Sequence, residues 1–363
     1  WEQRKLGELV GIYDGVHQTP DYQDSGIMFL SVENIATLKS EKYISEEAFE
    51  RDYKVYPEKG DILMTRIGDV GTTNVVETAE KVAFYVSLAL LKPNGIDSYF
   101  LSNAMKTNAF QKGLRERTLV TAIPQKINKD EIGKIDIFIT NNDEEQKKIG
   151  AYFSNLDHLI TFHQRKCEQT KKLKKYMLQK MFPKEGQTVP EVRFEGFTDA
   201  WEKRKFGDLG SVSMCKRIFK EQTATEGDIP FYKIGTFGGE PDAFISRALF
   251  EEYKEKYQYP EVGDMLISAS GTIGRTVEYA GEDAYFQDSN IVWFKHDDRV
   301  DNSFLKCIYS SVKWSGIEGS TIKRLYNDNF LKTEFSMPNA EEQKKIGEYF
   351  QNLDHLITLH QRK

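Results

Sequence analysis

The chain has 363 residues, of which 39% are hydrophobic and 29% charged. This length suits two domains, and the composition excludes disordered and fibrous proteins. The net charge of −6 excludes a uniformly basic nucleic-acid binder, although residues 144–184 carry a local net charge of +6. No apolar run reaches the roughly 20 residues of a membrane-spanning helix. Three cysteines without CxxC spacing predict neither a disulfide framework nor a zinc site, so we expect a cytoplasmic protein.

An internal repeat organises the chain. Residues 144–166 and 341–363 differ at only three of 23 positions, and Trp-Glu-x-Arg-Lys occurs at both 1–5 and 201–205. The spacing between the copies drifts along the chain, which indicates loop insertions on a shared scaffold. The near-identical segments predict one task performed twice, whereas the diverged bodies predict related but different tasks. Duplication followed by uneven drift is the alternative. We expect a body at 1–142, a long helix at 143–182, a linker at 183–200, a body at 201–339 and a helix at 340–363.

Both near-identical segments predict long helices. Residues 141–143 offer an N-cap, and apolar residues then recur in steps of four and three from Ile149 to Met181. This heptad seam predicts a coiled coil, with His163 as a polar residue that sets the register. His158 and His163 lie five residues apart, which is wrong for a metal pair on one helix face, so we predict no metal site. We expect the two helices to pair antiparallel, with an intermolecular coiled coil as the alternative. The residues predicted to bind partners are Gln146, Ile149, Phe153, Leu156, Ile160, Gln343, Ile346, Phe350, Leu353 and Ile357.

Each body is predicted to be mixed α/β, a twisted β-sheet with small helices. In the first body the pattern predicts a strand over 62–66, a Gly-rich loop over 68–72, a strand over 82–91, a helix over 98–113 and a polar loop over 115–121. The second body repeats this order with a strand over 265–270, a Gly-rich loop over 271–275, a strand over 285–294, a helix from 302 and a polar loop over 319–324.

The loops of the bodies combine basic and hydroxyl side chains. Arg and Lys can contact guanine or phosphate, Ser and Thr can contact base edges or phosphate, and glycine permits close backbone approach. Tight hairpins with exposed polar tips are the alternative interpretation. The residues predicted to contact DNA are Thr65, Arg66, Thr72, Arg115, Arg117, Thr118, Thr121, Ser268, Ser270, Thr272, Arg275, Thr321, Lys323 and Arg324.

Catalytic signatures are absent from the sequence. It contains no GxxxxGK[ST], GxGxxG or GxSxG motif, and no Asn/Asp-Pro-Pro-Phe/Tyr tetrapeptide of adenine methyltransferases. These absences favour a recognition protein over an enzyme with two catalytic bodies. A third hypothesis is a coiled-coil interaction protein that does not bind DNA, which would not require basic loops at matched positions.

The order of motifs resembles that of the specificity (S) subunits of Type I restriction–modification systems, the HsdS family. The motifs that carry this resemblance are Glu-Glu-Gln-Lys-Lys-Ile-Gly at 144–150 and 341–347, Lys-Lys-Tyr-Met-Leu-Gln-Lys-Met-Phe-Pro at 174–183, and Val-Pro-Glu-Val-Arg-Phe-Glu-Gly-Phe at 189–197. The resemblance spans the whole chain. The sequence departs from the family pattern at both ends: it starts at Trp1, without the upstream Pro-Glu-x-Arg-Phe segment, and it stops at Lys363, so we expect a truncated second helix.

The resemblance implies that each body is a target-recognition domain for one half of a bipartite double-stranded DNA sequence. It further implies that the two helices pair antiparallel, set the gap between the half-sites and dock two methyltransferase (M) subunits. The M subunits would carry S-adenosylmethionine and methylate adenine N6. Restriction (R) subunits would add ATP- and Mg-dependent cleavage. The chain itself would bind no cofactor, contain no active site and contact no membrane.

Overall fold

A computed structural model describes residues 1–319 and 323–361. The chain divides into two compact units, unit 1 (Trp1–Thr161) and unit 2 (Phe162–Lys363). Each unit is described by itself. Within the described ranges, no helix combines the length and the apolar character needed to cross a membrane.

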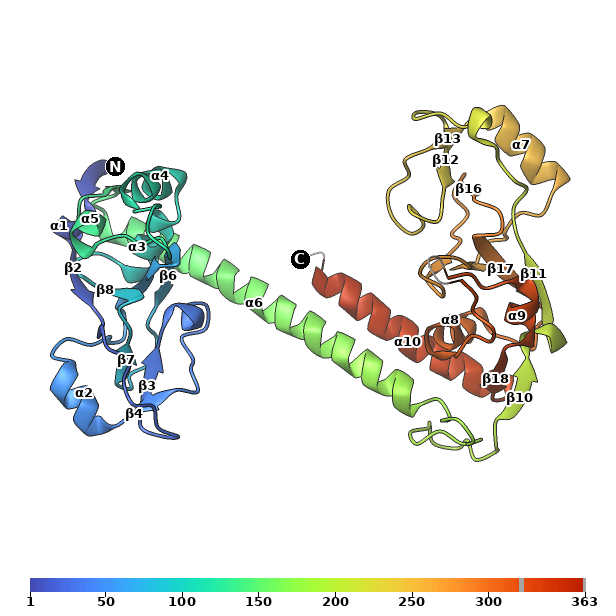
Figure 1. The fold of residues 1–363 in the computed structure, drawn as a ribbon, viewed down its shortest axis with the longest axis horizontal. Helices are drawn as coiled ribbons and strands as arrows, with labels where there is room; N and C mark the ends of the chain where they lie inside the picture. Colours follow the sequence, from blue (N-terminus) through green and yellow to red (C-terminus); the bar gives the residue numbers. More distant parts are fainter. Residues whose placement is uncertain (320–322, 362–363) are drawn as a thin grey trace. The chain divides into compact units, whose positions relative to one another are not determined.

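Unit 1 contains three β-sheets (Figure 1). The largest is an antiparallel sheet with the order β2-β8-β5-β6. A second sheet has the order β4-β3-β7, in which β3 and β7 run parallel, and β1 pairs with β9. The strands are β1 Glu2–Lys5, β2 Val10–Asp14, β3 Ile27–Leu30, β4 Tyr43–Ile44, β5 Ile62–Ile67, β6 Asp69–Val75, β7 Val82–Phe84, β8 Leu88–Pro93 and β9 Asp136–Ile139.

Two hydrophobic clusters form the core of unit 1. One contains Phe100 and Phe110 together with residues of the four-stranded sheet. The other contains Phe29, Phe49 and Phe84. The helices of unit 1 are α1 Leu6–Leu9, η1 Val32–Asn34, α2 Glu46–Asp52, α3 Ser98–Met105, α4 Asn108–Arg117, α5 Lys129–Gly133 and α6 Asp143–Lys180, the last of which continues into unit 2.

Unit 2 repeats this strand topology. Its sheets have the orders β11-β17-β14-β15, β13-β12-β16 and β10-β18. The predicted mixed α/β class and the internal repeat are therefore confirmed. The strands are β10 Glu202–Lys205, β11 Gly210–Ser213, β12 Ile229–Tyr232, β13 Phe244–Ile245, β14 Met265–Ser268, β15 Thr276–Glu278, β16 Tyr285–Phe286, β17 Ile291–His296 and β18 Glu334–Met337. The helices are η2 Phe206–Asp208, η3 Lys220–Gln222, α7 Arg247–Lys256, α8 Asn302–Ser311, α9 Asn327–Lys332 and α10 Ala340–Gln361.

Several predicted elements have different bounds in the structure. The strand expected over 82–91 is two strands in different sheets, because the Leu88 N–H bonds to the Tyr85 carbonyl (2.9 Å) and closes a turn. The strand expected over 285–294 divides in the same way into β16 and β17. The apolar run hides both turns because both flanking strands are buried. The helix expected over 98–113 is likewise two helices, α3 and α4, since Thr107 is in an extended conformation.

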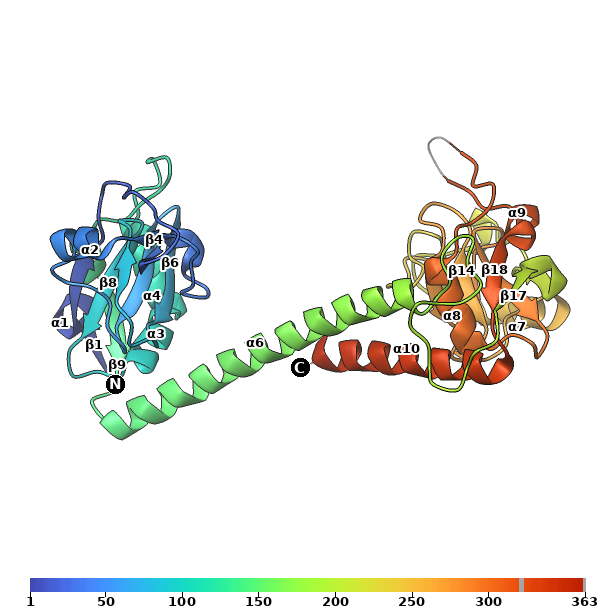
Figure 2. The ribbon, with the colours of Figure 1, turned by 90° about the horizontal axis from the view of Figure 1, so that it is seen from below.

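In unit 2, the C-terminal half of α6 packs antiparallel to α10 (Figure 2). His163 Nδ1 lies 2.9 Å from His360 Nδ1, so the seam histidine meets its own repeat counterpart. Cys167 contacts the carbonyl of Ile357, and further along Lys174 forms an ion pair with Asp354. The predicted antiparallel pairing is thus confirmed for this stretch of the helices.

The segment after α6 continues this packing within unit 2. Met181 and Phe182 join the core around Trp201. Arg193 donates from Nε and Nη2 to the carboxylate of Glu342 at 2.7 and 2.8 Å, and the Glu342 side chain is fully buried. The predicted helix 143–182 therefore ends at Lys180, and Arg193 attaches the predicted linker 183–200 to unit 2.

Candidate nucleic-acid interface

The end of β5 and the end of β14 carry the first predicted contact residues. The hydroxyl of Thr65 accepts a hydrogen bond from the Thr72 N–H (2.9 Å), and Ser268 accepts one from the Arg275 N–H (2.9 Å). Both hydroxyl groups are buried. Thr65 and Ser268 therefore close hairpins and are not placed to contact DNA, contrary to the prediction from residue type. Thr72 is exposed, on β6 instead of in the predicted Gly-rich loop.

Arg66 is also buried, near the C-terminal end of β5. We call the surface where β5 ends in unit 1 and β14 ends in unit 2 the edge of each unit. Its guanidinium forms an ion pair with Asp14 at the end of β2, and its Nε has no hydrogen-bond partner among the described residues. The charge of Arg66 is thus largely compensated inside unit 1. A direct contact between this side chain and a base would require Arg66 to leave Asp14.

A short hairpin is fastened to this edge in each unit. In unit 1 it spans residues 119–126, where the Leu119 N–H bonds to the Lys126 carbonyl (2.8 Å). In unit 2 its described residues are 318, 319, 323 and 324, where the Arg324 N–H bonds to the Glu318 carbonyl (2.8 Å). We call these the edge hairpins. Thr321, a predicted contact residue, lies outside the described residues.

The two edge hairpins are attached through the same backbone bonds. The Gly68 N–H bonds to Gln125 and the Gly271 N–H bonds to Lys323, both to the carbonyl at 2.9 Å. Two residues further along, the Ile127 N–H bonds to the Arg66 carbonyl (3.0 Å) and the Leu325 N–H bonds to the Ala269 carbonyl (2.8 Å). These bonds make Gln125 and Lys126 the counterparts of Lys323 and Arg324. Sequence reasoning missed Gln125 and Lys126 because it matched residues 115–121 with residues 319–324. The observed offset of 198 residues between the counterparts is close to the offset of 197 between the repeated segments at 144 and 341.

The basic residues of 115–117 lie elsewhere than predicted. They belong to the last turn of α4, not to a loop. Arg115 is exposed, whereas Arg117 donates to the Gly113 carbonyl (3.2 Å) and the Thr118 hydroxyl to the Leu114 carbonyl (2.8 Å). Thr121 is exposed in the edge hairpin.

Arg324 heads a polar cluster in unit 2. Its Nη2 lies 3.3 Å from the side-chain oxygen of Asn290, which also accepts a bond from the buried Ser270 hydroxyl (2.7 Å). Arg324 and Tyr326 line a hollow of about 540 Å³. Thr272 and Arg275, in the loop after β14, are exposed, and Arg275 also donates to the carbonyl of Phe237 (2.7 Å). The fold brings Ser270, Arg324 and Asn290 together, and no sequence pattern predicts Asn290.

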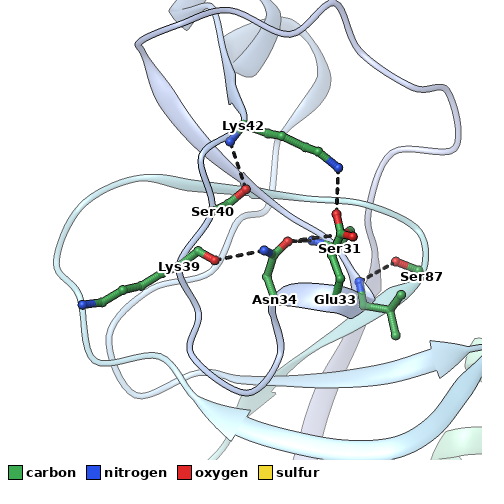
Figure 3. Close-up of polar contacts among 8 residues, drawn as sticks. Ser31, Glu33, Asn34, Lys39, Ser40, Lys42 and Ser87 are labelled. Carbon is green, nitrogen blue, oxygen red and sulfur yellow. Dashed lines mark hydrogen bonds and ion pairs between the residues drawn. The ribbon is translucent and has the colours of Figure 1, made fainter. Parts of the chain in front are cut away.

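A loop after β3 adjoins the same edge and was not predicted (Figure 3). The Val32 N–H bonds to the Ser87 hydroxyl (3.1 Å), and the Ser87 carbonyl accepts the Arg66 N–H (2.9 Å). The side-chain oxygen of Asn34 accepts a hydrogen bond from the Ser31 N–H (2.9 Å). Lys42 pairs with Glu33 in the same loop (2.7 Å), which lowers the pKa of that carboxyl (Figure 3).

Unit 2 builds this loop on the same bonds with other side chains. The Lys233 N–H bonds to the Thr236 hydroxyl (3.1 Å), and the Ile234 N–H bonds to the Gln287 side chain (2.9 Å). Thr236 thus replaces Asn34, and Gln287 takes the part of Ser87. The two units therefore share a backbone framework at this edge but present different polar groups on it.

The predicted partner residues of the helices fall into two groups. Gln146 and Gln343 are buried, and each bonds the cap of a helix in its own body: the Gln146 side chain accepts the Asp97 N–H and the Gln343 side chain the Asp301 N–H, both at 3.0 Å. Ile346 is buried and Ile149 packs against the core of unit 1. In the second copy, Phe350 and Leu353 are buried and Ile357 is half-buried, whereas the first-copy residues Phe153, Leu156 and Ile160 are exposed.

Potential metal ligands do not cluster in the described part of the chain, where no group of three or more His, Cys, Asp or Glu side chains could hold an ion. What the edge offers is peptide N–H groups, amides, hydroxyls and basic side chains. These are groups that bind phosphates and base edges.

Comparisons with known proteins agree with this architecture. A model of the Type I restriction modification DNA specificity domain matches residues 1–172 and 198–363. The specificity subunit S.HindORF215P of Haemophilus influenzae is 58% identical over 158 residues, which cover 42% of this chain and 41% of that protein. The chain therefore spans less than half the length of this relative.

More distant similarity covers the whole chain. The specificity subunit of the type I restriction enzyme MjaX of Methanocaldococcus jannaschii is 23% identical, over 100% of this chain and 89% of that protein. The crystal structure of a Type I restriction–modification S subunit from M. genitalium has the same fold, with a TM-score of 0.68 at 14% identity, covering 100% of this chain and 91% of that one. Two family domains in one chain, on this fold, place the protein in the family of Type I restriction–modification DNA specificity subunits.

Proposed function

We propose that each unit recognises one half of a bipartite duplex DNA target and that α6 and α10 set the spacing between the half-sites. The observation that carries this proposal is the matched edge of the two units. The same backbone bonds hold Gln125 and Lys126 in unit 1 and Lys323 and Arg324 in unit 2. A shared framework with exchanged side chains suits two readers of different sequences, because groups on base edges determine direct recognition.

The contact residues we retain are those with accessible side chains. They are Thr72, Arg115, Thr121, Lys126, Thr272, Arg275, Lys323 and Arg324, with Asn290 beside Arg324. Arg117, Thr118 and Ser270 bond within their own units. We assign them a supporting role at the edge.

We further propose that the helices dock two methyltransferase subunits. Leu159 and Phe162 are exposed on α6, and their repeat counterparts Leu356 and Leu359 are exposed on α10. These side chains stay exposed on both copies, including the copy whose seam is covered. Two equivalent apolar surfaces suit two copies of one partner.

The chemistry would then belong to the partners, in the cytoplasm. The M subunits would bring S-adenosylmethionine for adenine N6 methylation, and the R subunits ATP and Mg for cleavage, with no active site in this chain. The residues outside 144–184 carry a net charge of about −12, so we propose that the M subunits supply many of the phosphate contacts. The salt dependence of DNA binding should then be steeper for the complex of two M subunits with this chain than for the chain alone. Equal slopes would remove this part of the proposal.

The experiment for the whole proposal is genome-wide mapping of adenine methylation by single-molecule sequencing. Cells expressing the matching M subunit are compared with and without this chain. A new bipartite motif that depends on the chain supports the proposal and gives both half-sites and the gap. Co-purification with M but no methylation would contradict the recognition role. Failure to co-purify would favour a coiled-coil interaction protein that does not bind DNA.

A further inference from the structure

The edge hairpin of unit 1 exposes apolar side chains from its base, at Leu119, to its tip. The side chains of Leu119, Val120 and Ile123 are 44%, 70% and 99% exposed. Single exposed apolar residues are common, but three within one eight-residue hairpin are unusual. A group of this kind marks a contact surface.

The hairpin is held firmly at its base. In addition to the pair between Leu119 and Lys126, the Gly68 N–H bonds to the Gln125 carbonyl (2.9 Å) and the Gln125 side-chain amide donates back to the Gly68 carbonyl (3.0 Å). The tip is therefore presented from a fixed base on the edge of the four-stranded sheet. Because the base is already ordered, less conformational entropy is lost when the tip binds a ligand.

The surroundings of the tip fit a duplex. Lys126 at the base of the hairpin and Arg115 at the end of α4 are both exposed and basic. Positive charges beside a small apolar projection complement a groove, where phosphates line the rims and base surfaces form the floor. An apolar protein surface would not complement those charges.

We propose that Ile123 contacts the apolar surface of a base in the DNA groove. This inference rests on the proposed function of unit 1. The partner surface is either a thymine methyl group or the face of a base at an opened step, since aliphatic side chains contact both. Ile123 is then a specificity-determining residue of unit 1.

The test uses the complete complex of this chain with its M subunits and a duplex containing the mapped target. Ile123→Ala removes most of the apolar side chain, and we expect it to weaken binding about tenfold while leaving the salt dependence unchanged. The matched control is Val262→Ala. Val262 is 73% exposed, but it lies in the turn before the start of β14, at the opposite end of that strand from the edge. The control should bind as the wild type does.

Two further arms distinguish the base surfaces. Replacing target thymines with deoxyuridine should weaken wild-type binding but not Ile123→Ala binding, if the contact is a methyl group. If the step is opened, the fluorescence of a 2-aminopurine placed at that step should increase when the wild-type complex binds but not when the variant binds. A response in either arm supports the inference.

Three outcomes would overturn it. In the first, Ile123→Ala binds and methylates the target like the wild type, although the wild type recognises it. In the second, the variant loses affinity for M instead of DNA, which would make the tip a protein contact. In the third, the wild-type complex binds no duplex, and the proposed function fails together with this inference. Because Ile123 is fully exposed, Ile123→Ala should unfold at the same temperature as the wild type. A thermal unfolding scan therefore serves as the control that the variant is folded.

Discussion

The two copies of the repeated helical segment share nearly every residue, yet unit 1 and unit 2 bury them differently. Phe153 in the first copy is 45% exposed, whereas its counterpart Phe350 is 2% exposed. Trp1 is 69% exposed and its counterpart Trp201 only 2%. In unit 2, the C-terminal half of α6 and the segment that follows it cover this surface. The same motif is therefore buried or exposed according to which segments pack against it.

Other positions of the segment behave alike in both copies. Gln146 and Gln343 bond the caps of α3 and α8, and Gly150 and Gly347 lie directly against these helix ends. The motif Glu-Glu-Gln-Lys-Lys-Ile-Gly therefore fastens each long helix to its own body. Its near-identity needs no shared external partner at these positions.

The largest predicted difference concerns the two phenylalanines. Phe350→Ala should lower the unfolding free energy of unit 2 by about 3–5 kcal/mol, because it opens a cavity in a packed core. Phe153→Ala should lower that of unit 1 by less than about 1 kcal/mol, because the side chain is half in solvent. Urea unfolding followed by circular dichroism checks both. Equal losses in the two variants would contradict the difference in burial.

The next largest effect concerns the buried ion pair of unit 2. Arg193→Met leaves the Glu342 carboxylate buried without its partner and should cost about 3 kcal/mol of unfolding free energy. The double variant Arg193→Met with Glu342→Met should recover much of this loss, since no charge is left unpaired. Glu145→Gln, at the counterpart of Glu342, is the control with little effect. If Arg193→Met alone had the same urea midpoint of unfolding as the wild type, the Arg193–Glu342 ion pair would not contribute to stability.

A third pair of variants tests where the copies agree. A Cβ at Gly347 would lie 1.7 Å from the Ser303 Oγ, and one at Gly150 would lie 2.8 Å from the Phe100 backbone nitrogen. Gly347→Ala and Gly150→Ala should each destabilise their unit by about 1–3 kcal/mol through overpacking. Calorimetry of the two variants measures this. A loss in only one unit would show that the helix attachments are not equivalent.

The smallest effect is the pH dependence that Glu191 contributes to the stability of unit 2. Hydrogen bonds from Lys180 and Lys184 lower the pKa of Glu191 from 4.5 to about 2. Because the folded-state pKa is the lower one, the contact stabilises unit 2 fully above pH 4.5, and this stabilisation is lost as the pH falls towards 2. Glu191→Gln should flatten this part of the stability profile between pH 5 and pH 3. A profile unchanged by the substitution would show that the contact is not formed in solution, where a surface pair is weak in any case.

The sequence was informative where a local pattern has one structural solution. The N-cap before α6, the heptad seam and the helix starts at 98 and 302 correspond to observed helices and to an observed antiparallel contact. The edge was predicted only in part, because residue type does not report orientation. The hydroxyl groups of Thr65 and Ser268 are suited to DNA contacts by type, but both bond inside hairpins.

By itself, then, the sequence determined the repeat, the two α/β bodies and the apolar face of each long helix, since these depend on periodicity and local capping. Only the tertiary structure decided which copy of that face is buried, which basic residues share an edge and which hydroxyls are used internally. The physical reason is that burial and hydrogen bonding depend on segments distant in sequence. Met181 and Arg193 cover the second copy of the repeat, and nothing within the repeat itself specifies their positions.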